Sequence, residues 1–597
     1  MQKALTGIIT PLATPFTKGG DKVAKAMPPL IMGRDTPLYA CLDKHPKFED
    51  GFKMAADLRQ MYDEDQDLRK VIDVAKGLEG LRRQDGIHAA AVVITKDSLT
   101  EYLPIQRKPE AGKPIEMSPV VTQYEMNGVE SLGLLKMDFL GLRNLDVISD
   151  TLALIKKNRD IDLDIDNVSL EDAKTYELLG RGDTIGVFQL EGGAMRALVR
   201  SLAPDKFEDV AALVALYRPG PMSVNMHNDY ADYKNGRKSV TYFHPEAQDV
   251  LEDTYGLMIY QESVMRVAQK FAGYSLAQAD SLRKAMGKKS REVMAKERQS
   301  FVDGVEATGH PRALGDSLFE IIAQFADYAF NKSHSFGYGV VTFQTAYLKA
   351  HYPVEYLAAL LTSVKTSLEK AAVYLNECRT MGIRVLVPDV NRSEVDFAPA
   401  RLDGDEVIYF GLSAVRNVGE ALVERIVAER VAAGPFADFY DFCERVDLTV
   451  LNKKTLESLI RAGGFDSLGH PRRGLLAVFE QIVDTTISRR RERDQGVMSL
   501  FEVADAGPSF DERSPIPDLQ FDKKEQLAFE KEMLGLYVSD HPLMGAEAAL
   551  RRKTDLTIVE LADLDDGTMR TIGGVVNGLQ RKWTKKGDLM AVFTLED

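Results

Sequence analysis

The chain has 597 residues, a formal net charge of −15 at pH 7, 45% hydrophobic residues and 28% charged residues. This length exceeds what one hydrophobic core supports and predicts about three to five globular domains. No apolar run reaches the roughly 20 residues of a membrane span, and the acidic balance argues against a protein that binds nucleic acid through its overall charge.

The first segment, ALTGIITPLATPF at 4–16, is apolar, but Pro11 and Pro15 interrupt it and no small-residue cleavage site follows. We therefore expect no export signal. Cys41, Cys378 and Cys443 are widely spaced and form no CxxC pair. This pattern predicts reduced thiols in a cytoplasmic protein without membrane association.

Helices and short strands follow along the chain. Residues 22–80 show apolar residues at helical spacing, and HAAAVVIT at 88–95 indicates a strand. Strand and helix compete for GLLKMDFLGL at 133–142, whereas residues 165–490 are mostly helical in pattern. Pro- and Asp-rich residues 501–522 indicate a loop or linker, and residues 568–597 alternate like the first strands of a β-barrel.

Asp138 stands in an otherwise apolar segment, GLLKMDFLGLRNLDVISD, that resembles protein core. A carboxylate in such a place is costly unless a cation faces it. Two partners meet this need, namely a neighbouring arginine such as Arg143 or a metal ion. The acidic runs at 63–67 and 160–166 are instead expected on a helix surface and a solvated loop.

The sequence has no GxxxxGK[ST] loop and no strand-coupled GxGxxG, but basic and aromatic residues recur in three segments. Each segment alone is typical of a turn or a capped helix. Together they predict a pocket for a triphosphate and for base stacking. No cluster of histidine and acidic ligands is evident. The segments are GDTIGVFQLEGGAMRALVR (182–200), ALYRPGPM (215–222) and FNKSHSFGYGVVTFQTAYLKAHYP (330–353).

Five motifs in this order closely resemble the replicative DNA polymerase III alpha subunits of bacteria, and the actinobacterial branch most of all. The likeness runs from about residue 22 to the end. It implies an α+β multidomain fold that is mostly helical, with a partial C-family palm, thumb and fingers, a helix–hairpin–helix region and a truncated OB β-barrel. The motifs are GLLKMDFLGLRNL, GVFQLEGGAMR, ALYRPGPM, YGLMIYQESVMRVAQKFAGYSLAQADSLRKAMGKK and FNKSHSFGYGVVTFQTAYLKAHYPVEYLAALLTSV.

The resemblance also implies domain boundaries. Residues 1–21 look foreign, since LTGIITPLATPF resembles the opening strand of the dihydrodipicolinate synthase family of (β/α)8 barrels. A thumb-like helical region, the second half of the palm and the fingers follow at 22–82, 83–150 and 151–365. A clamp-binding region with tandem helix–hairpin–helix motifs, a linker with a helical connection and the start of an OB domain complete the order at 366–502, 503–567 and 568–597.

The activity implied by the resemblance is template-directed transfer of deoxynucleoside monophosphates to a primer 3′-hydroxyl, with two Mg²⁺ ions held by three palm aspartates. Asp138 matches the third aspartate, and no PD-x-D-x-DF-type strand supplies the first two. The family likeness thus implies a polymerase that is N-terminally incomplete, and we expect little or no extension by this chain alone. The alternative is a catalytically silent module that binds DNA and the sliding clamp.

The resemblance assigns further residues to primer–template DNA, dNTPs, the sliding clamp and other replicase subunits. The turn Val418–Gly419 in GLSAVRNVGEALVERI (411–426) implies a sequence-independent phosphate contact, with NKKTLESLIRAGGFDSLG (452–469) as its partner. The QGVMSLFE segment (495–502) implies clamp binding through Gln495, Met498, Leu500 and Phe501. Residues implied to contact nucleotide or DNA phosphates are Lys136, Arg143, Gln189, Arg196, Arg218, Lys288, Lys289, Lys332, Ser333 and His334.

Half a palm would leave an unpaired apolar sheet edge. We therefore expect residues 83–150 to pack less well than the fingers.

Overall fold

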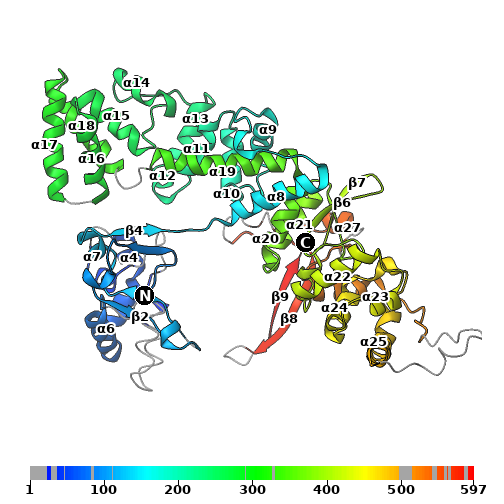
Figure 1. Ribbon diagram of the computed structural model, residues 1–597. Helices are drawn as coiled ribbons and strands as arrows, with labels where there is room; N and C mark the ends of the chain where they lie inside the picture. The colour runs from blue at the N-terminus through cyan, green and yellow to red at the C-terminus, as the bar shows by residue number, and fades with distance from the viewer. Residues whose placement is uncertain are drawn as a thin grey trace, which may run out of the picture. The chain divides into compact units, whose positions relative to one another are not determined.

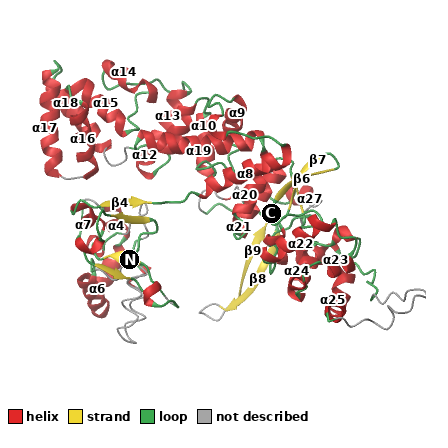
Figure 2. Ribbon diagram, viewed as in Figure 1, coloured by secondary structure: helices red, strands yellow, loops and turns green. Residues whose placement is uncertain are grey.

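The computed structural model describes residues 23, 25–28, 36–45, 48–81, 86–110, 112–288, 291–325, 330–495, 514–540, 543, 547–556, 558, 561, 567–583 and 589–596. The chain divides into two compact units, Met1–Gly141 and Leu142–Asp597 (Figure 1). Helices dominate, and the strands form small separate sheets (Figure 2). The mostly helical prediction is confirmed, while the foreign-looking residues 1–21 lie outside the described part.

Helices come first in the first unit, as the periodicity of residues 22–80 predicted. In α6 the Asp65 side chain caps the N-terminus, and Leu68, Val71, Ile72 and Ala75 are buried at the spacing of one helix face. The acidic run at 63–67 is exposed, as predicted. The helices are α3 (Leu38–Leu42), α4 (Glu49–Met54), α5 (Ala56–Glu64) and α6 (Gln66–Leu78).

Two antiparallel strand pairs and α7 (Met126–Ser131) complete this unit. The pair of β1 (Ala91–Ile94) with β4 (Leu135–Asp138) confirms the first predicted strand and resolves the ambiguous segment as a strand. The second pair joins β2 (Ile105–Arg107) and β3 (Val120–Thr122).

One face of the β1–β4 pair is apolar and exposed. Val92 lies opposite Met137, and Ile94 lies opposite Leu135. Because directly opposed residues of an antiparallel pair project to the same side, these four side chains share a face. Each of them is 41–56% exposed. The wider expectation that residues 83–150 pack less well than the fingers stays a prediction, since Val147 and Ile148 within this range are buried.

The second unit is built around α19, which packs against α8, α9, α11 and α20. All residues of α11 from Asp209 to Leu216 are buried, as expected for a helix surrounded by others. The α8 helix runs through residue 150, where we had placed the boundary between palm and fingers. The bounds are α8 (Arg143–Arg159), α9 (Ala173–Arg181), α10 (Gly193–Leu202), α11 (Phe207–Leu216), α12 (Pro219–Ser223), α13 (Met226–Lys234), α19 (Lys332–His351) and α20 (Pro353–Ser363). Between α8 and α9, the acidic residues at 160–166 form an exposed loop, as predicted.

A second group of helices has a hydrophobic core of its own. Phe271, Phe301, Leu318 and Ile322 are fully buried in this core. The group comprises α14 (Gln248–Leu251), α15 (Gln261–Ala272), α16 (Leu276–Lys288), α17 (Arg291–Ala307) and α18 (Arg312–Phe325).

The remainder combines helices with two sheets. Strand β7 (Asp405–Tyr409) lies between β5 (Arg384–Leu386), which is parallel to it, and β6 (Ala398–Leu402), which is antiparallel. Strands β8 (Val575–Trp583) and β9 (Leu589–Glu596) form a hairpin at the place predicted for the OB domain. The helices are α21 (Leu368–Thr380), α22 (Glu420–Ala433), α23 (Phe439–Arg445), α24 (Lys453–Ala462), α25 (Arg472–Asp494), α26 (Lys523–Leu534) and α27 (Glu547–Arg551). Among the described helices, none combines the length and hydrophobicity needed to cross a membrane.

Candidate functional site

Asp138 lies at the end of β4 and faces a lysine. The Lys136 ammonium donates to both carboxylate oxygens, at 2.8 and 3.0 Å, and His88 Nδ1 lies 3.8 Å from Asp138 Oδ1. The hydrogen bond from Lys136, together with the field of that ammonium and of His88, lowers the pKa of Asp138 below its usual value. The carboxylate is therefore ionised at neutral pH.

The expectation that Asp138 lies in a core segment is wrong. Its side chain is 42% exposed, and neighbouring Phe139 is 62% exposed. The predicted alternative partner Arg143 begins α8 in the second unit, where its Nη1 donates to the Ser363 carbonyl at 3.3 Å. Because the Asp138 side chain is partly exposed, the carboxylate keeps part of its hydration.

As a metal ligand, Asp138 is chemically suitable, and His88 is the neighbouring side chain that could join it. An exposed ionised carboxylate is the oxygen donor that Mg²⁺ prefers. Among the described residues, no group of three or more His, Cys, Asp or Glu ligand atoms includes Asp138. The described part of the chain thus offers one carboxylate here, with His88 beside it, and no complete two-ion site.

Basic and aromatic side chains gather at the start of α19, as the sequence predicted. The Arg218 guanidinium lies 4.1 Å from the centre of the Phe330 ring, and Phe330 contacts His334 with centroids 5.3 Å apart. His334 in turn lies against Tyr338, with centroids 4.5 Å apart. With Lys332, these residues form what we call the aromatic–basic cluster. Burial lowers the pKa of Arg218 from its very high usual value, and the group stays charged.

Lys332 is held in place by one carboxylate and two rings. Its ammonium lies 2.9 Å from Asp253 Oδ2, and 5.5 Å from the ring centres of both Tyr260 and Phe336. Asp253 also pairs with Arg266 at 3.3 Å. Glu262 also lies at this turn, where its Oε2 accepts a hydrogen bond from the Lys332 backbone N–H at 2.9 Å. Two carboxylates therefore face the two cations beside the exposed first turn of α19, where Ser333 lies.

Gln189 and Arg143 line a common cavity of about 260 Å³ within the second unit. Gln189 is exposed between buried Phe188 and Leu190 and adopts φ 63°, a left-handed conformation that is rare for residues other than glycine. Lys370 lines the same cavity. The sequence analysis missed Lys370, because it lies far from Gln189 in the chain and in no motif.

Arg196 belongs to a different environment. Its Nε donates to the Gly182 carbonyl at 3.1 Å, so the side chain braces the turn that follows α9. No contact of Arg196 with the aromatic–basic cluster is found among the described residues. Its predicted phosphate role stays a prediction.

The predicted helix–hairpin–helix turn is present. Val418 is buried, and Gly419 is exposed at the N-cap of α22 with open space where a side chain would stand. Asn417, with φ 64°, makes the tightest bend, and its side chain donates to Ser458 Oγ on the partner helix at 3.1 Å. The two motif segments therefore pack together, as predicted.

Several predicted residues fall at or beyond the limits of the described structure. Gln495 directly follows α25 and is exposed, which suits a peptide that binds a partner. Lys288 ends α16, and its side chain is not among those described. Lys289, Met498, Leu500 and Phe501 lie outside the described residues.

The structure also assembles a group that the sequence analysis missed. His244, Glu246 and His310 bring three ligand atoms within 4.8 Å of one another. The expectation that no cluster of histidine and acidic ligands exists is wrong, since chain folding rather than spacing brings His310 to the other two.

Three family models match the chain in succession. Residues 21–141 match the bacterial DNA polymerase III alpha NTPase domain, residues 144–309 the finger domain of the same subunit, and residues 382–475 a helix–hairpin–helix motif. The DNA polymerase III subunit alpha of Mycobacterium leprae is 48% identical over 583 residues, which cover 97% of this chain and 48% of the relative.

The chain belongs to the bacterial DNA polymerase III alpha subunit family.

Other relatives agree with this assignment. The subunit of Mycobacterium tuberculosis is 48% identical over 589 residues, and that of Thermus aquaticus is 42% identical over 594 residues. Each alignment covers 97% of this chain, and 48% and 46% of the respective relatives. The chain thus spans about half the length of the curated polymerase subunits it matches.

Proposed function

We propose that this chain carries nucleotide- and DNA-binding parts of a replicative DNA polymerase, which transfers deoxynucleoside monophosphates to a primer 3′-hydroxyl in the cytoplasm. The aromatic–basic cluster on α19 is the observation that carries the proposal. It joins Arg218, within the segment that matches the finger-domain model, to a helix start that carries Lys332, Ser333 and His334.

The cluster offers both kinds of contact that a nucleotide needs. Arg218 and Lys332 supply positive charge for phosphates, and the rings of His334 and Tyr338 supply flat surfaces for a base or sugar. Asp253 and the surrounding rings fix Lys332 before any ligand arrives, which reduces the entropy cost of binding. Gln189, Arg143 and Lys370, around their shared cavity, are proposed as further polar contacts to the substrates, and Arg196 as a more distant one.

We assign Asp138 to one coordination position of a Mg²⁺ ion, which would stabilise the charge that develops during phosphoryl transfer. Lys136 presently satisfies the carboxylate, so metal binding exchanges that ion pair for coordination and frees Lys136 for a phosphate. Single-nucleotide primer extension with Mg²⁺ tests the assignment. Little extension is expected from this chain alone, and what occurs should fall at least 100-fold in Asp138→Asn. Extension that survives this change would contradict the assignment.

The C-terminal half is proposed to hold DNA and the sliding clamp alongside other replicase subunits. The exposed backbone at Gly419 suits a phosphate contact without sequence preference. Outside this half, Lys288 and Lys289 are proposed as further phosphate contacts. The peptide with Gln495, Met498, Leu500 and Phe501 is proposed to bind the clamp. Phe501→Ala should weaken binding to an immobilised sliding clamp at least 10-fold, since buried aromatic anchors dominate such peptides. An unchanged affinity would refute this assignment.

A further inference from the structure

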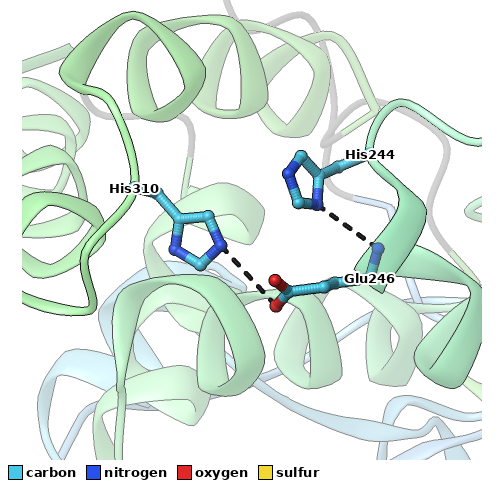
Figure 3. A group of neighbouring side chains, drawn as sticks. All are labelled: His244, Glu246 and His310. Carbon is cyan, nitrogen blue, oxygen red and sulfur yellow. Dashed lines mark hydrogen bonds and ion pairs between the residues drawn. The ribbon is translucent and has the colours of Figure 1, made fainter.

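We propose that His244, Glu246 and His310 form a binding site for a divalent transition metal ion, best suited to Zn²⁺, on the helical group α14–α18. Figure 3 shows the two imidazoles approaching the Glu246 carboxylate and backbone from separate chain segments. His244 and Glu246 flank Pro245 at the 3₁₀ turn Pro245–Ala247, whereas His310 lies between α17 and α18. Two nitrogen donors and one carboxylate are a common ligand set for zinc.

The distances suit a small ion. Glu246 Oε2 lies 3.6 Å from His310 Nε2, and the three ligand atoms are all within 4.8 Å of one another. Ligands around a tetrahedral zinc ion stand about 3.4 Å apart, given metal–ligand bonds of about 2.1 Å. The Glu246–His310 pair already has this spacing.

The surroundings fix the proton on His310 away from Glu246. Thr308 Oγ1 lies within hydrogen-bonding distance of two carbonyls, Phe271 O at 2.6 Å and Val305 O at 2.8 Å, and it donates its single proton to one of them. Its oxygen therefore accepts a bond from His310 Nδ1–H, at 3.2 Å.

Metal-bound histidines characteristically donate their other ring proton to a fixed acceptor, which is the role Thr308 plays here. Lys270 is the cation whose field reaches Glu246, and its ammonium is bonded to Asp249 at 2.9 Å. The carboxylate of Glu246 is thus left with His310 as its ion-pair partner among the described residues.

The rings are held rigidly enough for a site. Phe271 is fully buried and contacts both imidazoles, with centroids 5.6 Å from His244 and 5.4 Å from His310. His244 Nδ1 accepts a 3.3 Å hydrogen bond from the Glu246 backbone N–H, which coordination through this nitrogen would replace. Glu246 is 50% exposed, so water can reach the fourth coordination position. A bound ion would tie the turn before α14 to the turn between α17 and α18.

Titration of the chelator-treated 597-residue chain with Zn²⁺ and Co²⁺ tests the proposal. We expect one equivalent to bind, with the visible absorption of four-coordinate Co²⁺ and slower hydrogen exchange at 244–247 and 308–312. Glu246→Gln should weaken binding at least 10-fold, whereas Glu252→Gln, an exposed carboxylate on the next turn, should not change it. His310→Asn, which removes a different ligand, should also weaken metal binding.

Three results would overturn the site. They are no stoichiometric uptake by the wild-type chain, uptake that both variants retain, and uptake with Co²⁺ spectra that show sulfur ligands from Cys41, Cys378 or Cys443. If hydrogen exchange at these two turns instead depends on pH alone and ignores Zn²⁺, the group is a protonated His310–Glu246 ion pair.

Discussion

Replacing Lys349 by methionine should loosen the loop that carries Gln189. The Lys349 side chain is fully buried, and its ammonium donates to the carbonyls of Asp183 and Ile185 at 2.8 Å each and to Glu377 Oε1 at 2.5 Å. Burial lowers the pKa of this lysine, and the contact with Glu377 opposes that effect. One charge thus joins α19 and α21 to the turn that leads into Gln189.

The variant Lys349→Met keeps the side-chain volume but leaves the Glu377 carboxylate buried without a charge partner and two carbonyls without a donor. Breaking a buried pair from one side typically costs about 3–5 kcal/mol. Removing both charges in Lys349→Met/Glu377→Leu should restore most of this stability, because no buried charge then remains.

Hydrogen exchange of a peptide covering residues 183–191 measures the effect locally, which avoids assuming that this multidomain chain unfolds in one step. A loss of about 3–5 kcal/mol corresponds to roughly 100- to 5000-fold faster exchange where the open form recloses faster than it exchanges, so that the rate follows the opening equilibrium. Exchange within about 5-fold of wild type in Lys349→Met, or a double variant worse than the single one, would refute the reasoning.

Two further predictions concern capping and packing. The hydrogen bonds from Thr449 lower the pKa of Asp447 to about 2, so the stabilisation from this carboxylate is complete above its usual value of 3.8 and is lost as pH falls toward 2. The difference in thermal midpoint between the wild type and Asp447→Asn should therefore decrease as pH falls from 3.8 toward 2. A difference that stays constant over this range would contradict the prediction. Gly474→Ala should cost about 1–3 kcal/mol in denaturant unfolding, because a Cβ there would lie 1.9 Å from the Pro517 carbonyl oxygen. In α9, a Cβ added at Gly180 would have no neighbouring atom within 4 Å, so Gly180→Ala should instead stabilise the protein by about 0.5–1 kcal/mol. If the two glycine substitutions changed stability equally, packing around the added Cβ would not be the cause.

Local features of this fold were predictable from the sequence. The cluster residues Lys332, His334 and Tyr338 fall within two turns of one helix, so a contiguous motif suffices to place them together. The strand at 91–94 and the helix–hairpin–helix turn are equally local. In each case the residues that decide the structure are neighbours in the chain.

Features that depend on tertiary packing were not predictable. Asp138 was expected in a core, yet the sheet that carries it is open to solvent, and exposure is a property of what covers a strand rather than of its own residues. The cavity that joins Gln189 to Lys370 and the meeting of His310 with Glu246 arise from segments far apart in sequence. Spacing rules carry no signal for such contacts.

Equilibrium binding of primer–template DNA across a range of salt concentrations, with and without the matching dNTP, tests the central claim most directly. We expect the chain to bind DNA more weakly as salt rises, the dNTP to strengthen binding, and Arg218→Ala/Lys332→Ala to remove that strengthening and to reduce the salt slope by about 1 to 2. Lys238→Ala, which alters a surface lysine paired with Asp229 at 2.7 Å, should bind like wild type. A chain that binds no primer–template DNA, or a double variant that responds to dNTP and salt as wild type does, would contradict the assignment of the aromatic–basic cluster to nucleotide and DNA.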